Sequence, residues 1–228
     1  MMLVDYVQQG EAERDAVHIR GRWWETRFHI GHSTLSKRHR GLYSVGNFYT
    51  SYTLRGPTRE AVAAALAGRS AIVTPERTGC IVVFDEQSES QNWEIIAGLA
   101  SRLSRELRCP VLAVLNHDDE IFQYQLYVDG RWVDEYSSSS AYFEGEPFDC
   151  AGGDARALCR AFGVANFTEV EDILRASDNG EYIFAFERHA DLVRALGIPP
   201  FGVCRGYHYV SRGELPCGLE AGDLLEVK

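Results

Sequence analysis

The sequence predicts an α+β protein built around a ferredoxin-like sheet. Residues 48–138 carry strand and helix patterns in the order strand, helix, strand, strand, helix, strand, followed by a hairpin. A split βαβ order of this kind gives an antiparallel sheet with its helices on one face. A Ser/Gly-containing stretch then separates this domain from shorter helix and strand patterns that follow it. We therefore predict four segments: a basic, poorly ordered N-terminal extension (1–46), a ferredoxin-like domain (47–138), a linker (139–153) and a small α+β unit (154–228).

Each element of the larger domain has a local signal. Residues 48–54 are rich in aromatic and β-branched side chains, which is typical of a strand. Residues 61–67 favour a helix that ends at Gly68, and apolar residues recur at helical spacing over 93–107. The unbroken apolar run over 111–115 suits a strand covered on both faces. Two further strands are predicted over 70–74 and 80–84.

The hairpin over 121–136 is the best-defined part of the prediction. Apolar and polar residues alternate over 121–128, as in a half-solvated strand. Asp129-Gly130 then provides a two-residue turn, because this pair tolerates the positive φ angles that such a turn requires. The resulting register pairs Val128 with Arg131, Tyr127 with Trp132 and Leu126 with Val133.

In the C-terminal unit, Asp154 is a predicted N-cap for a helix that ends at Gly163. Thr168 opens a capping box for a second helix, which runs to residue 175. The remaining patterns predict a strand over 182–186, a helix over 188–196, a broken strand over 201–211 and a last strand over 224–227.

Charge and composition limit the classes of partner. The chain has 228 residues and a net charge of −10, which argues against general nucleic-acid binding because such binding depends on neutralising phosphates. Residues 18–41 are the exception, with six Arg or Lys and four of the seven histidines. This segment is interpreted either as an arm for nucleic acid or an acidic partner, or as a poorly ordered leader.

The sequence predicts a cytoplasmic protein without a cofactor. No apolar run approaches the ~20 residues of a membrane span, and the first residues lack a secretory signal pattern. Six scattered cysteines without a C-x-x-C pair are typical of free thiols in a reducing compartment. Cofactor-binding glycine loops of the GxGxxG and Walker types do not occur in the sequence.

An acidic elbow, His117-Asp118-Asp119-Glu120, separates two of the predicted strands. Its carboxylates and imidazole are ligand types that bind divalent cations. The alternative is a solvated connector, since neighbouring residues of an extended segment point to alternate sides. A divalent-metal-dependent hydrolase or nuclease using His117, Asp118 and Asp119 is therefore kept as the second functional hypothesis.

Four stretches of the sequence resemble other proteins. They are FYTSYTLRGPT, CIVVFDEQSESQ, CPVLAVLNHDDEIFQYQLYVDGRWVDEY and ERHADLVRALGIPPFGVCRGYHYVSRGELP. Over about residues 47–217 the chain resembles a group of uncharacterised bacterial proteins. The resemblance implies that the shared part begins near Phe48. It implies no activity, cofactor or catalytic residue.

The first functional hypothesis is a non-enzymatic protein-interaction module of the immunity-like or regulatory kind. Its basis is an acidic chain with a long aromatic hairpin and no catalytic signature. Tyr and Trp are common at the centres of protein interfaces. The predicted binding residues are Tyr124, Tyr127, Trp132 and Asp134, the predicted partner is another protein, and nucleic acid is expected only through residues 18–41.

Overall fold

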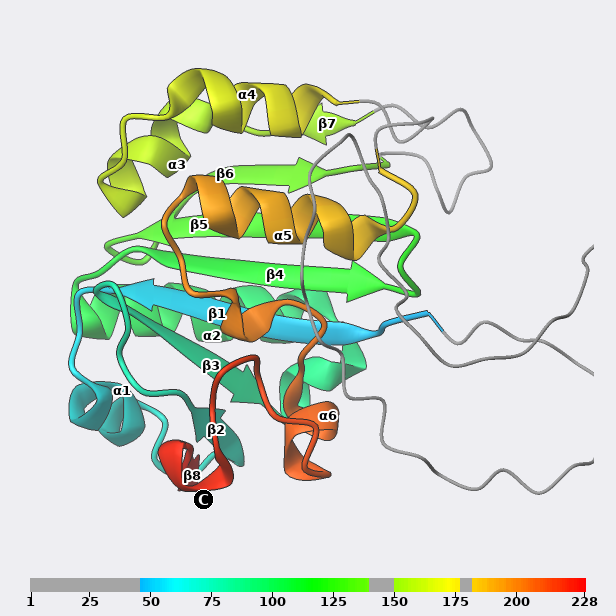
Figure 1. The fold of residues 1–228 in the computed structure, drawn as a ribbon. Helices are drawn as coiled ribbons and strands as arrows, with labels where there is room; N and C mark the ends of the chain where they lie inside the picture. Colours follow the sequence, from blue (N-terminus) through cyan, green and yellow to red (C-terminus); the bar gives the residue numbers. More distant parts are fainter. Residues whose placement is uncertain (1–45, 140–149, 177–181) are drawn as a thin grey trace, which may run out of the picture. The chain divides into compact units, whose positions relative to one another are not determined.

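A computed structural model of the chain describes residues 46–139, 150–176 and 182–228. These residues belong to one compact unit. The α+β class is confirmed: an eight-stranded antiparallel sheet and six α-helices make up the described part of the chain (Figure 1). The predicted N-terminal extension and most of the predicted linker lie outside the described residues.

The strands lie in the order β7-β6-β5-β4-β1-β3-β2-β8. Their bounds are β1 Tyr49–Arg55, β2 Ala71–Val73, β3 Cys80–Asp85, β4 Val111–His117, β5 Ile121–Val128, β6 Arg131–Ser137, β7 Ala151–Gly152 and β8 Leu225–Val227. The α-helices are α1 Arg59–Ala65, α2 Trp93–Leu107, α3 Ala155–Phe162, α4 Phe167–Arg175, α5 Ala185–Ala195 and α6 Tyr207–Ser211. The described residues also form the 3-10 turns η1 Gln87–Ser90, η3 Pro200–Gly202 and η4 Ala221–Asp223. From β1 to β6, the elements follow in the predicted order.

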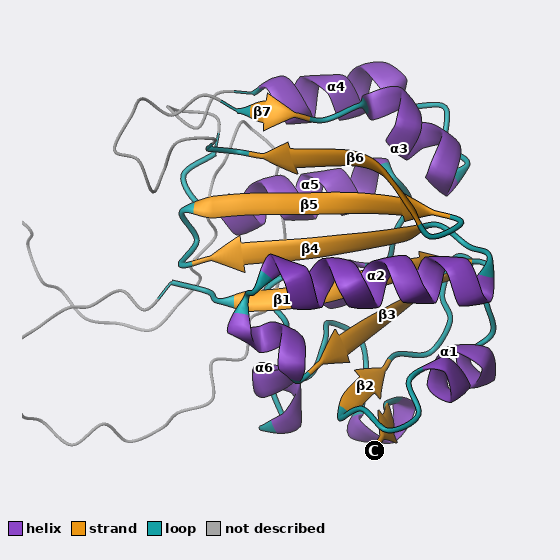
Figure 2. Cartoon of the chain, turned by 180° about the vertical axis from the view of Figure 1, so that it is seen from behind, coloured by secondary structure: helices purple, strands orange, loops and turns teal. Residues whose placement is uncertain are grey.

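Helices cover both faces of the sheet, so the prediction of helices on one face is wrong. In β4, Val111 and Ala113 pack in the cluster that α1 and α2 complete, while Leu112 and Val114 pack in a second cluster with α3, α4 and α5. Figures 1 and 2, which are opposite views, show these two helical layers on the two sides of the sheet. The unbroken apolar run of β4 has this cause, because both of its faces are buried.

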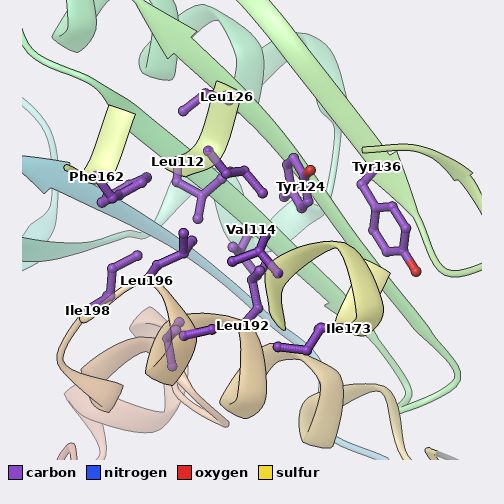
Figure 3. Close-up of a cluster of buried hydrophobic side chains, with 14 of the residues drawn as sticks. Leu112, Val114, Tyr124, Leu126, Tyr136, Phe162, Ile173, Leu192, Leu196 and Ile198 are labelled. Carbon is purple, nitrogen blue, oxygen red and sulfur yellow. The ribbon is translucent and has the colours of Figure 1, made fainter. Parts of the chain in front are cut away.

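The predicted separate unit over 154–228 does not form. Its helices α3, α4 and α5 share a core with the strands, in which Leu192, Leu196 and Ile198 meet Leu112 and Val114 (Figure 3). The last strand, β8, pairs with β2 at the other edge of the sheet. Helices that are amphipathic but short cannot bury their apolar faces alone, so they pack on the sheet face that α1 and α2 leave open.

Two predicted strands of this region do not form. The segment predicted as a strand over 182–186 leads into α5, which begins at Ala185. The Glu187 carboxylate caps this helix, because it accepts the backbone N–H groups of Ile183 and Phe184 at 2.8 and 2.9 Å. The segment over 201–211 forms η3 and α6. Short apolar runs do not distinguish a strand from a buried helical turn, and tertiary contacts decided both cases.

The capping signals gave mixed results. Asp154 caps α3 as predicted, and Gly163 ends it with a positive φ of 64°. Helix α4 begins one residue before Thr168, with Asn166 at the N-cap position, so the predicted Thr168 capping box is wrong. Helix boundaries are the least certain part of a prediction from sequence, because neighbouring polar residues compete for the cap.

The hairpin of β5 and β6 is confirmed, with one correction to its register. Tyr127 pairs with Trp132 as predicted, but Leu126 pairs with Asp134 and not with Val133. Val133 is the extra residue of a β-bulge, which lies between the Tyr127 and Leu126 pairs. A bulge shifts the following side chains to the opposite faces, so it decides which hairpin residues are exposed.

Candidate functional site

The structure separates the four hairpin residues that the sequence predicted as a binding surface. Tyr124 and Tyr127 are buried, on opposite faces of β5. Burial raises the pKa of both hydroxyl groups, so both stay protonated at neutral pH. The Tyr124 hydroxyl donates to Asp134 Oδ2 at 2.7 Å, and the backbone N–H of Asp154 donates to the same oxygen at 2.9 Å. These contacts join β5, β6 and the start of α3, which is a structural role.

Trp132 is the predicted binding residue that presents a large side chain to solvent. It is 58% exposed, and the neighbouring Val133 is 47% exposed. Trp132 lies opposite Tyr127 on the α2 side, and the bulge at Val133 turns the next residue, Asp134, toward the α3 side. The indole N–H of Trp132 donates to the Asp134 carbonyl at 3.1 Å, which holds the ring beside the strand.

Trp132 lies at one end of a surface that no sequence pattern identified. We call this surface the open sheet face. Because side chains alternate along a strand, Gln123 and Gln125 of β5 point to the same side as Tyr127. Their partners on β6, Ser137 and Glu135, therefore point to that side too. The open sheet face consists of Trp93, Gln123, Gln125, Trp132, Glu135 and Ser137.

The open sheet face is hollowed beside the first residue of α2. A depression of about 380 Å³ lies there. It is lined by residues of α2, β5, β6 and β7: Trp93, Gln123, Tyr124, Gln125, Glu135, Tyr136, Ser137, Ala151 and Gly152. The Trp93 indole donates to Gln123 Oε1 at 3.1 Å, and Gln123 Nε2 donates to Ser137 Oγ at 3.1 Å. This chain of hydrogen bonds fixes the floor of the depression.

Topology explains why this face is open. Helices α1 and α2 follow β1 and β3, and they cover the strands nearest to them. After β4 the chain makes two tight antiparallel connections, to β5 and β6, and it then passes to the other face as α3 and α4. Figure 2 shows α2 lying along β1 and β4, with most of the width of β5 and β6 beside it. Helix α2 touches the hairpin at its turn, where Ser101 Oγ donates to the Gly130 carbonyl at 2.7 Å, and at Trp93.

At the other predicted site, the acidic elbow, Asp119 forms a structural clasp. Its Oδ2 accepts the backbone and side-chain N–H groups of Asn47, both at 2.8 Å, and its Oδ1 accepts Asn116 Nδ2 at 2.9 Å. The Asp119 carbonyl accepts the backbone N–H of Ala185 at 2.7 Å. Asp119 thus ties the start of β1, the end of β4 and the start of α5 together.

His117 and Asp118 make other contacts. His117 Nδ1 lies 2.8 Å from Gln91 Oε1, and its Nε2 lies 3.8 Å from Asp118 Oδ2. Both aspartates of the elbow have positive φ angles, 52° for Asp118 and 58° for Asp119. Within residues 46–139, 150–176 and 182–228, no group of three or more His, Cys, Asp or Glu side chains is placed to hold a metal ion.

A third cluster of reactive side chains lies in the core. The Tyr49 hydroxyl is 2.9 Å from His189 Nδ1, and the His189 ring stacks between Tyr49 and Phe122 with centroid distances of 5.8 and 5.3 Å. Burial lowers the pKa of His189 to about 3 and raises the pKa of the nearby Cys204 thiol to about 12. At neutral pH the imidazole and the thiol are therefore both uncharged, which is typical of core packing and not of an activated nucleophile.

Comparison with known proteins identifies no related protein. The chain has no significant match among protein-family models, curated proteins or solved structures. Among the helices that the structure describes, none has the length and apolar character of a membrane span. The candidate site therefore depends on the geometry of the open sheet face alone.

Sequence reasoning missed most of that face. The available signal was the alternation in β5, where the polar positions are Gln123 and Gln125. That alternation predicts one solvated side, whereas the predicted binding residues of β5 are the aromatic Tyr124 and Tyr127. Glu135 could not be assigned to either side of the sheet before the bulge was known, and Trp93 could not be placed beside β5 before the position of α2 was known.

Proposed function

We propose that the protein is a binding module whose open sheet face docks another protein. The observation that carries the proposal is the 58% exposure of Trp132 at one end of the open sheet face, which is hollowed beside Trp93. An exposed Trp is costly to hydrate, and Trp is among the residues that contribute most to protein interfaces. Trp93, at the other end of the face, adds a second indole.

Docking on the face is favoured over strand addition at the edge. Within the described chain, β6 pairs with β7 at Tyr136 and Ser137, so the rest of the outer edge of β6 has no strand beside it. That edge is interrupted by the bulge, and the Asp134 and Glu135 carbonyls already accept Trp132 Nε1 and the Gly153 N–H. Bulges and occupied carbonyls are ways in which proteins prevent pairing at a sheet edge.

The proposal includes two finer points about the chain. A ferredoxin-like core formed by β1–β4, α1 and α2 is supported by the central strand order β4-β1-β3-β2, with every neighbouring pair antiparallel. A cytoplasmic location is supported by the six cysteines, all of which are free thiols.

Affinity purification with the full chain as bait tests the proposal. Trp132→Ala removes the exposed indole, and Leu225→Ala is the matched control because Leu225 is an exposed apolar residue on β8, at the opposite edge of the sheet. We expect a stoichiometric protein partner with the wild type and with Leu225→Ala, and loss of that partner with Trp132→Ala. Thermal unfolding verifies that both variants are folded. Recovery of no stoichiometric partner, or equal recovery with Trp132→Ala, would contradict the proposal.

A further inference from the structure

The open sheet face has one charged side chain among its described members, the Glu135 carboxylate. Glu135 is exposed and lies opposite Gln125 in the sheet. Its carboxylate forms no hydrogen bond and no ion pair with any described residue. A charge in this position remains available to a ligand.

Arg175, which binds the backbone at the end of β7, does not pair with Glu135. Arg175 donates to the Gly152 and Gly153 carbonyls, both at 2.7 Å, and its Nε lies 3.1 Å from Glu171 Oε1. Its charge is therefore already balanced by Glu171. The chain as a whole has a net charge of −10, which attracts cationic partners over longer distances.

The remaining groups on the face suit a peptide backbone and a cationic side chain. Gln125 Oε1 accepts the Tyr127 hydroxyl at 2.7 Å, while Gln125 Nε2 donates to no described residue and is a free donor for a carbonyl. Gln123 and Gln125 are two residues apart on one strand, about 6.8 Å, which is also the repeat of side chains along an extended peptide. The two indoles that flank the face attract Lys and Arg through their π surfaces.

We infer that the open sheet face binds an extended segment of its partner that places a Lys or Arg side chain against Glu135, flanked by Trp93 and Trp132. This inference rests on the proposed function and adds the chemistry of the partner to it. Charge complementarity carries it: an unpaired carboxylate lies in a hollow of about 380 Å³ lined otherwise by neutral groups. The volume is of the size that a few side chains of a peptide fill.

Selection from a random peptide library displayed on phage tests the inference, with the full wild-type chain as the target. We expect enriched peptides to contain Lys or Arg. Dissociation constants of the enriched peptides are then measured for the wild type, Glu135→Gln, Trp132→Ala and the control Glu214→Gln. Glu214 is an exposed carboxylate that follows α6, away from the open sheet face. Circular dichroism and thermal unfolding establish that each variant keeps the fold.

Glu135→Gln and Trp132→Ala should each weaken binding about tenfold or more, the effect of one good electrostatic or cation–π contact, and Glu214→Gln should leave it unchanged. Peptides without basic residues, or peptides that bind Glu135→Gln as tightly as the wild type, would overturn the inference. If such peptides still lose binding with Trp132→Ala, the proposed function stands. Failure to select any peptide that depends on Trp132 would count against both.

Discussion

Replacement of Asp119 separates the two interpretations of the acidic elbow. In the clasp interpretation, the carboxylate stabilises the fold through its hydrogen bonds to Asn47 and Asn116. Loss of three partly buried hydrogen bonds at about 1 kcal/mol each costs about 3 kcal/mol. Ala also tolerates the φ of 58° poorly, which adds about 1 kcal/mol. Asp119→Ala should therefore lower the free energy of unfolding by about 4 kcal/mol.

Asp118 provides the matched control. Its φ of 52° is close to that of Asp119, but its side chain is 57% exposed and lies 3.8 Å from His117 Nε2. Asp118→Ala should therefore cost only the backbone component, about 1 kcal/mol. Asp119→Asn keeps a residue type that accepts positive φ and keeps one acceptor oxygen, so an intermediate loss of about 2 kcal/mol is expected.

Urea unfolding followed by tryptophan fluorescence measures these differences, and thermal unfolding provides a second reading. At about 2–4 °C per kcal/mol for a chain of this size, Asp119→Ala should melt about 8–16 °C below the wild type. A loss no larger than that of Asp118→Ala would refute the clasp. A rise in the wild-type melting temperature with Mn²⁺ or Zn²⁺ that disappears in Asp119→Asn would favour the metal interpretation in its place.

Three further predictions concern the core and the sheet edge. His189 stays neutral in the folded protein with a pKa of about 3, against 6.5 when unfolded, so the folded state loses stability as the pH falls below 6.5. Between pH 6.5 and 5, urea unfolding should show a loss of about 2 kcal/mol in the free energy of unfolding. This loss should be absent in His189→Phe. Gly152→Ala should lower the free energy of unfolding by about 1–3 kcal/mol in the same assay, because the φ of Gly152 is 73° and a Cβ would lie 2.2 Å from the Glu135 carbonyl oxygen. The control Gly222→Ala has open space around the new Cβ and should be neutral within about 0.5 kcal/mol. Leu192→Ala should cost about 2–5 kcal/mol if α5 shares the main core with the sheet, and a loss under 1 kcal/mol would show that it does not.

The elements with strong local signals were predictable from sequence. The bounds of α2 and β5 were predicted to the residue, and the Asp129-Gly130 turn formed where a pair tolerant of positive φ was expected. These features depend on neighbours within a few positions, such as helical spacing or strand alternation. Where two local conformations are close in energy, as over 201–211, the sequence predicted a strand and packing stabilised a helix. There the buried Glu89 accepts the Tyr207 N–H at 2.9 Å, and Val210 of α6 packs in the core.

The candidate site depended on contacts between distant parts of the chain. Residue types alone pointed to Tyr124 and Tyr127, but burial on the two faces of β5 removed them from the surface. One extra residue at Val133 determined the side of the sheet on which Glu135 lies, and a one-residue shift of this kind has no local signal in the sequence.

By itself, the sequence determined the α+β class, the order of elements from β1 to β6, the hairpin and the acidic charge, because each follows from local propensity, periodicity or composition. Only the tertiary structure decided that α3, α4 and α5 pack on the second face of the sheet, that Asp119 is a clasp and that β5 and β6 expose a polar face beside Trp132. The physical reason is that burial and pairing are properties of the assembled sheet, in which residues more than 100 positions apart, such as Tyr49 and His189, come into contact.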